Sequence, residues 1–249
     1  MLLENKVAII YGAGGSIGGA VARAFAREGA RVFLAGRTQA SLDEAADEIR
    51  SNGGAADTAI LDALDEQAVE NYVDAIVKQA GQIDISFNLI SYGDVQMPLL
   101  ELSVEDFMQP IMNAMRTHFL TTRAAIRHMV KHGSGVILAF GGGGPQTLPG
   151  LGGFKIALDA IEGLRRQWAI ELGRQGIRVV TIKTGGITDS IPENFPGRDE
   201  IVAGIQQAAL LNRTATLSDV GNVAAFVASD QARTMTSTEI NISSGAIVD

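Results

Sequence analysis

A cluster of glycines between residues 11 and 19 is the part of this sequence that most directly predicts chemistry. It follows the apolar run 7–10 and precedes a helix-compatible segment, residues 17–28. Glycines allow a tight turn, and the unpaired N–H groups at a helix N-terminus attract anions. The stretch therefore predicts a phosphate-binding turn, whose binding residues we expect to be Gly12, Gly14, Gly15, Ser16, Ile17 and Gly18.

Two charged residues at later strand ends suggest which nucleotide binds there. The second apolar run, 31–35, is followed by Gly36 and Arg37. A carboxylate at this point would bind the ribose 2′-OH of NAD, whereas a small residue and a guanidinium suit the 2′-phosphate of NADP. Asp62 ends the third strand and could accept a hydrogen bond from the adenine amino group. The sequence favours NADP(H) over NAD(H), although Arg37 and Asp62 could also be ordinary solvated residues.

Three further side chains are candidates for catalysis, and each has a structural alternative. Tyr92 follows the 88–91 turn at the end of the fourth strand, so its phenol either faces the cleft or packs beneath it. His118, on the long helix 104–132, either faces the same cleft or serves as an interface or capping residue. Lys155 could contact a ribose or point to solvent or a neighbouring subunit.

Strand and helix patterns alternate along the chain, which predicts βαβ units and a parallel sheet. Strands are expected at 7–10, 31–35, 56–61, 83–90, 136–140, 178–182 and 239–242. Helices are expected at 17–28, 38–51, 65–80, 104–132, from about 153 to 175, 199–211 and 218–229. The predicted fold is α/β: a single-domain, doubly wound parallel sheet (Rossmann fold) over residues 1–249, with helices on both faces.

Local sequence signals mark several predicted helix ends. Asp65 is suited to cap the helix that runs to Ala80, and Gly81 is suited to end it. Ser41 and Glu44 have the spacing of a capping box.

Composition narrows the possible partners and the compartment. The chain has 249 residues, a formal net charge of −8 and no basic run, so we expect it to bind neither nucleic acid nor membrane. It has no cysteine and only three histidines, which argues against a metal site. We find no secretory signal and expect a cytoplasmic protein.

Several segments together resemble the short-chain dehydrogenase/reductase family over the whole length of the chain. Residues 11–18 are similar to its glycine motif, and residues 169–172, 176–179 and 219–230 also look like family patterns. The resemblance implies binding of a nicotinamide cofactor, with Asn88 matching the turn after the fourth strand. It also implies that the main chain after Gly185, at Ile187, holds the nicotinamide carboxamide. It further implies a homodimer or homotetramer.

The resemblance fails at the residues that carry out the family's chemistry. Its members use a tyrosine, a lysine, a serine and an asparagine, and the corresponding positions here are Phe154, Leu158, Gly141 and Ala114. No Tyr or Ser occurs between Gly135 and Asp189. Ordinary carbonyl reduction by the family mechanism is therefore not expected, because a positioned acid/base contributes about 10² to 10⁴ in rate.

Two functions stay open, with a preference for the first. In the first, the chain is an NADP(H)-dependent oxidoreductase with an atypical site, acting on an activated C=C, C=N or carbonyl group of an apolar small molecule. The alternative is that the chain is a catalytically silent relative, which binds NADP(H) or stabilises a partner subunit. A lyase or isomerase without hydride transfer is a third possibility that no residue singles out.

Overall fold

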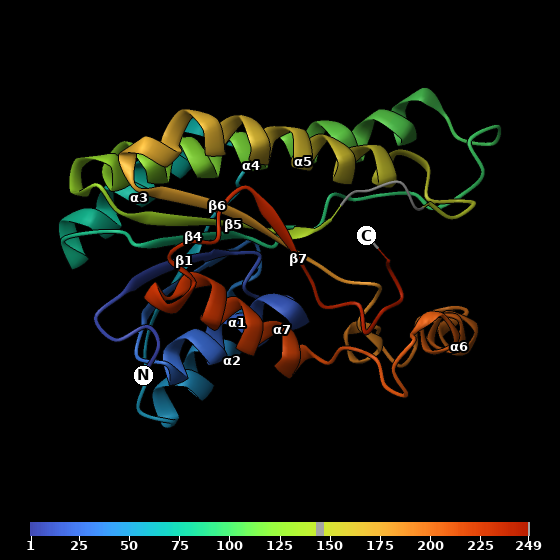
Figure 1. Ribbon diagram of the computed structural model, residues 1–249, viewed down its shortest axis with the longest axis horizontal. Helices are drawn as coiled ribbons and strands as arrows, with labels where there is room; N and C mark the ends of the chain where they lie inside the picture. Colours follow the sequence, from blue (N-terminus) through green and yellow to red (C-terminus); the bar gives the residue numbers. More distant parts are fainter. Residues whose placement is uncertain (143–146, 249) are drawn as a thin grey trace.

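A seven-stranded sheet forms the centre of the protein in the computed structural model, which describes residues 1–142 and 147–248. All neighbouring strands run parallel, in the order β3-β2-β1-β4-β5-β6-β7 (Figure 1). The strands are β1 (Val7–Tyr11), β2 (Arg31–Gly36), β3 (Ala55–Ile60), β4 (Ile85–Asn88), β5 (Gly135–Gly141), β6 (Ile177–Lys183) and β7 (Thr238–Asn241). The predicted doubly wound α/β sheet is confirmed.

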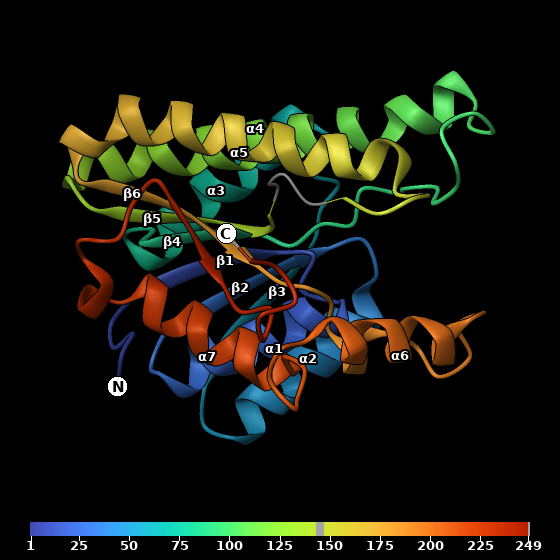
Figure 2. The ribbon, with the colours of Figure 1, turned by 45° about the vertical axis from the view of Figure 1, so that its right-hand side comes forward.

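Helices cover both faces of this sheet. They are α1 (Ser16–Arg27), α2 (Gln39–Ser51), α3 (Glu66–Ala80), α4 (Val104–His132), α5 (Gly152–Leu172), α6 (Arg198–Ala208) and α7 (Leu217–Ala228). Helices α3, α4 and α5 pack on one face, and α1, α2 and α7 pack on the other (Figures 1 and 2). No helix among residues 1–142 and 147–248 is long and apolar enough to cross a membrane.

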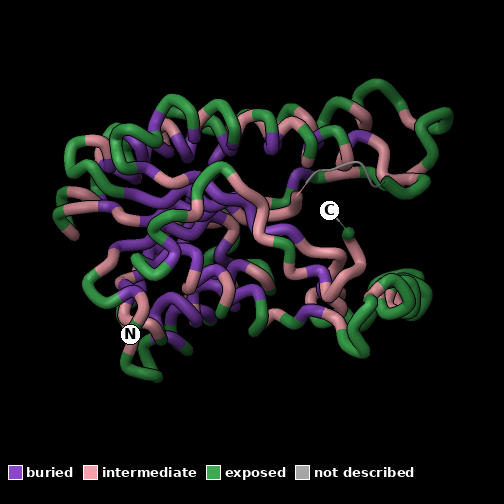
Figure 3. The backbone as a smooth tube through the Cα atoms, viewed as in Figure 1, coloured by how far each residue is buried: buried purple, intermediate pink, exposed green. Residues whose placement is uncertain are grey.

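The first strand shows why this layered arrangement forms. Every residue of β1 is buried, so the strand must be covered on both sides. Val7, Ile9 and Tyr11 belong to the apolar core beneath α3 and α4, whereas Ala8 and Ile10 belong to the core beneath α1 and α7. Buried positions concentrate in the sheet and exposed ones on the outer helix faces (Figure 3). Helix α6 differs, since none of its residues is buried.

Helix ends follow local signals in part. The Asp65 side chain accepts a hydrogen bond from the Ala68 N–H, and Gly81 ends α3 in a left-handed conformation, as predicted. The predicted capping box at Ser41 and Glu44 is wrong, because α2 already begins at Gln39. Thr38, rather than Ser41, is the N-cap residue of α2, and its side chain makes no capping hydrogen bond.

The loops that matter for function leave the carboxyl ends of the strands. Strand order reverses between β1 and β4, and ligands of such sheets bind outside the carboxyl ends at this point. The segments after β4 and β6 extend beyond the same edge of the sheet, toward the right of Figure 1. The segments after β4 and β6 carry three of the predicted site residues, Tyr92, Gly185 and Ile187.

Candidate active site

A cavity of about 330 Å³ lies at the point where the strand order reverses. Its walls come from the ends of β1, β2 and β3, from the turn after β4 and from α4. The predicted residues that line it are Gly12, Gly14, Gly15, Arg37 and Asp62. Five of the eleven predicted cofactor-binding residues therefore line one cavity, of a size suited to a small-molecule ligand.

The glycine turn is shaped by contacts that leave no room for side chains. Gly12 has φ +76°, and a Cβ there would lie 2.5 Å from the carbonyl oxygen of Leu89. A Cβ on Gly18 would lie 2.3 Å from the carbonyl oxygen of Gly12. Both glycines are therefore required for the turn and helix α1 to pack closely against the ends of β1 and β4.

The start of α1 provides the anion-binding groups. Its N-cap is Gly15, and no side chain caps the helix. The helix begins at Ser16, so the N–H groups of its first turn, including those of Ile17 and Gly18, have no partner four residues earlier within the helix. Such N–H groups, next to a cavity, fit the diphosphate of a dinucleotide.

Arg37 stands at the end of β2, directly after Gly36. It lines the cavity together with Thr38 and Ser41. Within residues 1–142 and 147–248, Arg37 makes no ion pair, so its guanidinium is available to an anionic ligand. The Asp62 carboxylate, across the cavity, accepts a hydrogen bond from the Leu64 N–H at 3.0 Å. The residues present fit NADP, since a guanidinium rather than a carboxylate follows β2.

Asn88 is buried at the end of β4 and fixes the turn that follows. Its side-chain oxygen accepts a hydrogen bond from the Ile90 N–H at 3.1 Å, and its amide donates to Thr121 Oγ1 at 3.3 Å. Leu89 and Ile90 line the cavity, so Asn88 holds part of its wall in place.

Gly185 and Ile187 lie apart from this cavity, after β6. Ile187 is buried. A Cβ on Gly185 would lie 2.8 Å from Ala246 Cβ, so the C-terminal segment packs against this turn. Their predicted contact with a nicotinamide carboxamide stays a prediction.

The structure brings two of the catalytic candidates into contact. The Tyr92 hydroxyl lies 3.0 Å from His118 Nε2, and both residues are buried, with exposures of 6% and 5%. Burial, with a smaller effect from Asp94, raises the pKa of Tyr92 well above its ordinary value. Burial lowers the pKa of His118 to about 4. The pair is therefore a neutral, buried hydrogen bond, which argues against Tyr92 as an easily ionised acid.

The neutral state of His118 predicts a pH dependence of stability. An unfolded histidine titrates near pH 6.5. The pKa of His118 is lower in the folded protein than in the unfolded chain. Its contribution to the free energy of unfolding is therefore fully present above pH 6.5 and is lost as the pH falls toward 4, by about 1.4 kcal/mol per pH unit. Urea unfolding of the wild-type protein and of His118→Gln should be measured across this pH range. The free energy of unfolding should decrease less in the variant than in the wild type as the pH falls. Identical pH slopes would contradict a neutral buried His118.

Next to this pair, the start of α5 is apolar. The Phe154 ring lies 6.2 Å from the Tyr92 ring, centroid to centroid. A Cβ on Gly141 would lie 2.5 Å from Leu158 Cδ2, so these two positions face each other. Ala114 is fully buried in the same cluster. Phe154, Leu158, Gly141 and Ala114, the four positions that the resemblance matches to the family's catalytic residues, thus lie close together. None of these four side chains can donate a proton.

Lys155, the third catalytic candidate, forms an ion pair with Asp159 at 2.5 Å, one turn further along α5. The Lys155 side chain does not join the apolar cluster, whose α5 members are Phe154, Ala157, Leu158 and Ile161.

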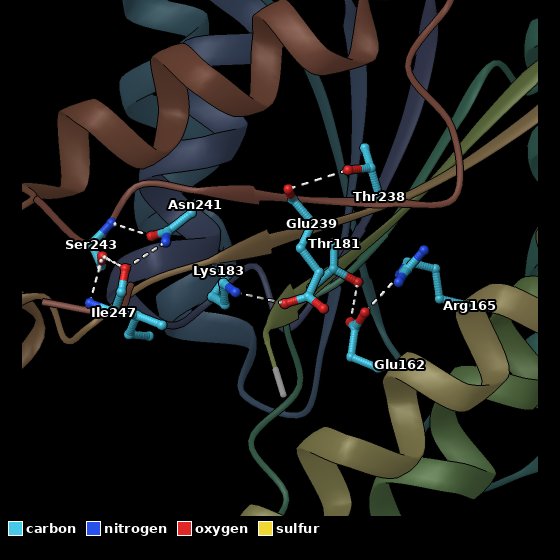
Figure 4. A network of polar contacts seen from close by, with 9 residues as sticks. All are labelled: Glu162, Arg165, Thr181, Lys183, Thr238, Glu239, Asn241, Ser243 and Ile247. Atoms are coloured by element: carbon cyan, nitrogen blue, oxygen red, sulfur yellow. Dashed lines mark hydrogen bonds and ion pairs between the residues drawn. The ribbon is translucent and has the colours of Figure 1, made fainter. Parts of the chain in front are cut away.

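A buried charge network beside this cluster was missed by the sequence analysis. Lys183, at the end of β6, pairs with Glu239 of β7 at 3.1 Å, and its side chain is only 3% exposed (Figure 4). Arg165 and Thr181 both donate hydrogen bonds to Glu162. Burial raises the pKa of Glu162, although these two hydrogen bonds oppose the shift. The signal in the sequence was a lysine directly after the predicted apolar strand 178–182.

Comparisons with known proteins agree on the family and the fold. Residues 12–246 match the family model described as enoyl-(acyl carrier protein) reductase. The uncharacterized oxidoreductase YxbG of Bacillus subtilis is 32% identical, over 98% of this chain and 91% of that protein. A dehydrogenase/reductase from Sinorhizobium meliloti superposes with a TM-score of 0.88 at 26% identity, covering 99% of this chain and 96% of that chain. An NAD+-bound xylitol dehydrogenase has the same fold, with a TM-score of 0.90, 24% identity and coverage of 98% and 100%.

Proposed function

The chain belongs to the short-chain dehydrogenase/reductase family, whose matched relatives are oxidoreductases, and on this premise we propose that it is an NADP(H)-dependent oxidoreductase with an atypical active site. Its substrate is an apolar small molecule with an activated C=C, C=N or carbonyl group. The observation that carries the proposal is the cavity lined by the glycine turn and Arg37. The glycine turn and Arg37 support cofactor binding, although the side chains that the family uses for catalysis are absent.

The binding roles follow from the positions of the residues. The first turn of α1, from Ser16, holds the diphosphate, and Arg37 holds the 2′-phosphate. Asp62 accepts a hydrogen bond from the adenine amino group, and Asn88 holds the cavity wall in place. The main chain at Ile187 contacts the nicotinamide carboxamide. When bound, the cofactor supplies a hydride.

The reaction must proceed without the tyrosine acid that the family uses. Reduction of an isolated ketone needs a proton donor at the oxygen, and Phe154, Leu158 and Gly141 provide none. Activated C=C and C=N bonds accept hydride with less help from an acid. The site therefore favours these bonds over ordinary ketones.

The experiment that tests this function follows NADPH oxidation with enoyl, imine and quinone substrates. Oxidation with at least one of these classes is expected, and Tyr92→Phe should retain the activity because its phenol is held by His118. A loss of about 10² to 10⁴ in rate in Tyr92→Phe would instead identify Tyr92 as the acid.

A silent NADP(H)-binding protein is the second candidate, and one observation favours it. Two positions that the resemblance assigns to catalysis are occupied by apolar packing, because Phe154 lies against Tyr92 and Leu158 faces Gly141. Tight NADPH binding without oxidation in any substrate class would support this candidate over the reductase.

Assembly through α4 and α5 is part of the same proposal. These helices lie side by side on one face of the molecule (Figure 2). Met112, Phe119 and Ile170 are large apolar side chains exposed on them, and the Phe119 ring stacks on Trp168. A homodimer or homotetramer would bury these side chains.

A further inference from the structure

A second cavity, of about 240 Å³, lies at the amino ends of the strands, the edge of the sheet opposite the proposed nucleotide site. Its walls come from the starts of β1, β4, β5 and β6 and from the segment between α7 and β7. We propose that this amino-edge cavity binds a small oxyanion, a phosphate or a carboxylate. Neither hydride transfer nor the nucleotide cavity takes part in this binding, which therefore goes beyond the proposed function.

Three basic side chains from distant segments meet at the amino-edge cavity. They are Lys6, just before β1, Arg178, in β6, and Arg233, after α7. No basic run in the sequence marks the cavity, because only the fold brings these residues together. The hydroxyl groups of Ser134 and Thr236 also line it and can donate hydrogen bonds. An oxyanion would therefore meet positive charge together with N–H and O–H donors.

Arg178 is the central cation of the cavity, because the main chain already holds its guanidinium in place. Its Nη1 donates a hydrogen bond to the Met235 carbonyl oxygen at 3.2 Å, and its Nη2 donates to the Ser229 carbonyl oxygen at 3.1 Å. A guanidinium carries five N–H donors, so donors remain for a ligand. A side chain that is held before binding loses less conformational freedom when the ligand arrives, which favours affinity.

The charge of Arg178 is half-buried without a carboxylate in contact. Among residues 1–142 and 147–248, Arg178 forms no ion pair. Burial lowers the pKa of Arg178, and Asp230 opposes this shift only in part. Burying a charge is unfavourable unless the charge is paired. A bound oxyanion would supply the counter-charge that the protein itself does not place against Arg178.

The two acidic residues that line the cavity leave its basic side chains available. The Asp84 carboxylate accepts hydrogen bonds from the Val7 N–H at 2.8 Å and from Gln82 Nε2 at 2.9 Å, so it secures the start of β1. Asp230 Oδ1 lies 3.5 Å from Lys6 Nζ, but the Asp230 side chain is 84% exposed. Exposed ion pairs are weak, so an oxyanion can compete with Asp230 for Lys6.

The size of the amino-edge cavity indicates a small ligand. Its volume of about 240 Å³ is below the range of about 300–1,000 Å³ that is typical of pockets for drug-sized molecules. Phosphate and short carboxylates are small enough for this space, and their oxygens match the planar fork of a guanidinium. The shared chemistry is therefore an oxyanion, and titration distinguishes the two classes.

Calorimetric titration of the full-length protein with inorganic phosphate and with succinate tests the proposal. Saturable binding of at least one of the two is expected, with a Kd at or below about 1 mM, whereas the neutral analogue succinamide should not bind. Constant ionic strength keeps the screening of charges equal in all titrations. Failure of both oxyanions to saturate the protein up to about 10 mM would overturn the proposal.

Arg233→Gln tests whether the oxyanion binds in the amino-edge cavity. Arg233 is exposed and forms no ion pair in the part of the chain that the structure describes, so this substitution should not lower Tm. It should weaken oxyanion binding about tenfold, because one charge-assisted contact is lost. The control Arg213→Gln removes an exposed positive charge between α6 and α7, away from the cavity walls, and should leave binding unchanged. Equal affinities of wild type and Arg233→Gln would exclude this cavity.

Two further variants separate the amino-edge cavity from the nucleotide cavity. Arg178→Gln should weaken oxyanion binding at least about 100-fold, because it removes the central cation. If the loss of its two main-chain hydrogen bonds prevents folding, Arg233→Gln decides the question. Arg37→Asp, at the nucleotide cavity, should retain oxyanion binding. Loss of binding in Arg37→Asp but not in Arg233→Gln would contradict the proposal, because the oxyanion would then occupy the nucleotide cavity.

Discussion

Replacing Gly18 with alanine should weaken NADPH binding at least about 100-fold, because the added methyl group would overlap the backbone. A Cβ at this position would lie 2.3 Å from the carbonyl oxygen of Gly12, and backbone cannot move aside as a flexible side chain can. The turn and the start of α1 would have to separate, which moves the N–H groups proposed to hold the diphosphate. Cofactor fluorescence measures the loss directly.

Two matched variants keep this prediction interpretable. Gly163→Ala makes the same substitution in α5 where no atom lies within 4 Å, and it should leave binding unchanged. Ser16→Asp adds a negative charge at the first residue of α1. It should weaken NADPH binding without lowering Tm, because an acidic residue stabilises a helix N-terminus while it repels a phosphate. NADPH binding at wild-type strength in both Gly18→Ala and Ser16→Asp would disprove the diphosphate assignment.

Replacing Arg37 with aspartate should weaken NADPH binding about 100-fold and NADH binding little, because a charge-assisted phosphate contact becomes a repulsion. The guanidinium follows Gly36 at the cavity wall and makes no ion pair in the described part of the chain. Removing it therefore breaks no protein contact of this kind, and the folded structure should persist.

NADH is the internal control for this substitution, since it differs from NADPH only in lacking the 2′-phosphate. Titration of both cofactors against wild type and Arg37→Asp gives the ratio of the two losses. An equal loss for both would refute the assignment of Arg37 to the 2′-phosphate.

The fold was predictable because its signals are local and repeated. Buried strands such as β1 appear as continuous apolar runs, and the glycine turn fixes the connection to α1. The ends of elements were less predictable. The predicted helix from about 153 to 175 is α5 followed by a short 3₁₀ turn at Gly173–Gln175, and the predicted strand 83–90 is shorter, at Ile85–Asn88. These limits depend on neighbouring strands and on packing, which periodicity does not encode.

The site was only partly predictable because its contacts join distant segments. Residues predicted from the glycine spacing, together with Arg37, line one cavity, whose binding of a nucleotide stays a prediction. The contact between Tyr92 and His118 joins the end of β4 to α4, and no pattern in either segment predicts it. The pairing of Lys183 with Glu239 depends on the neighbouring positions of β6 and β7 at the edge of the sheet, which only the sheet order reveals.

The most direct test of the proposed NADP(H) site is a fluorescence titration of the wild-type protein with NADPH and NADH. We expect NADPH to bind saturably and at least about tenfold more tightly than NADH, because a charge-assisted contact to phosphate is worth about 1.5–3 kcal/mol. Absence of binding by either cofactor, or tighter binding of NADH, would contradict the proposed site.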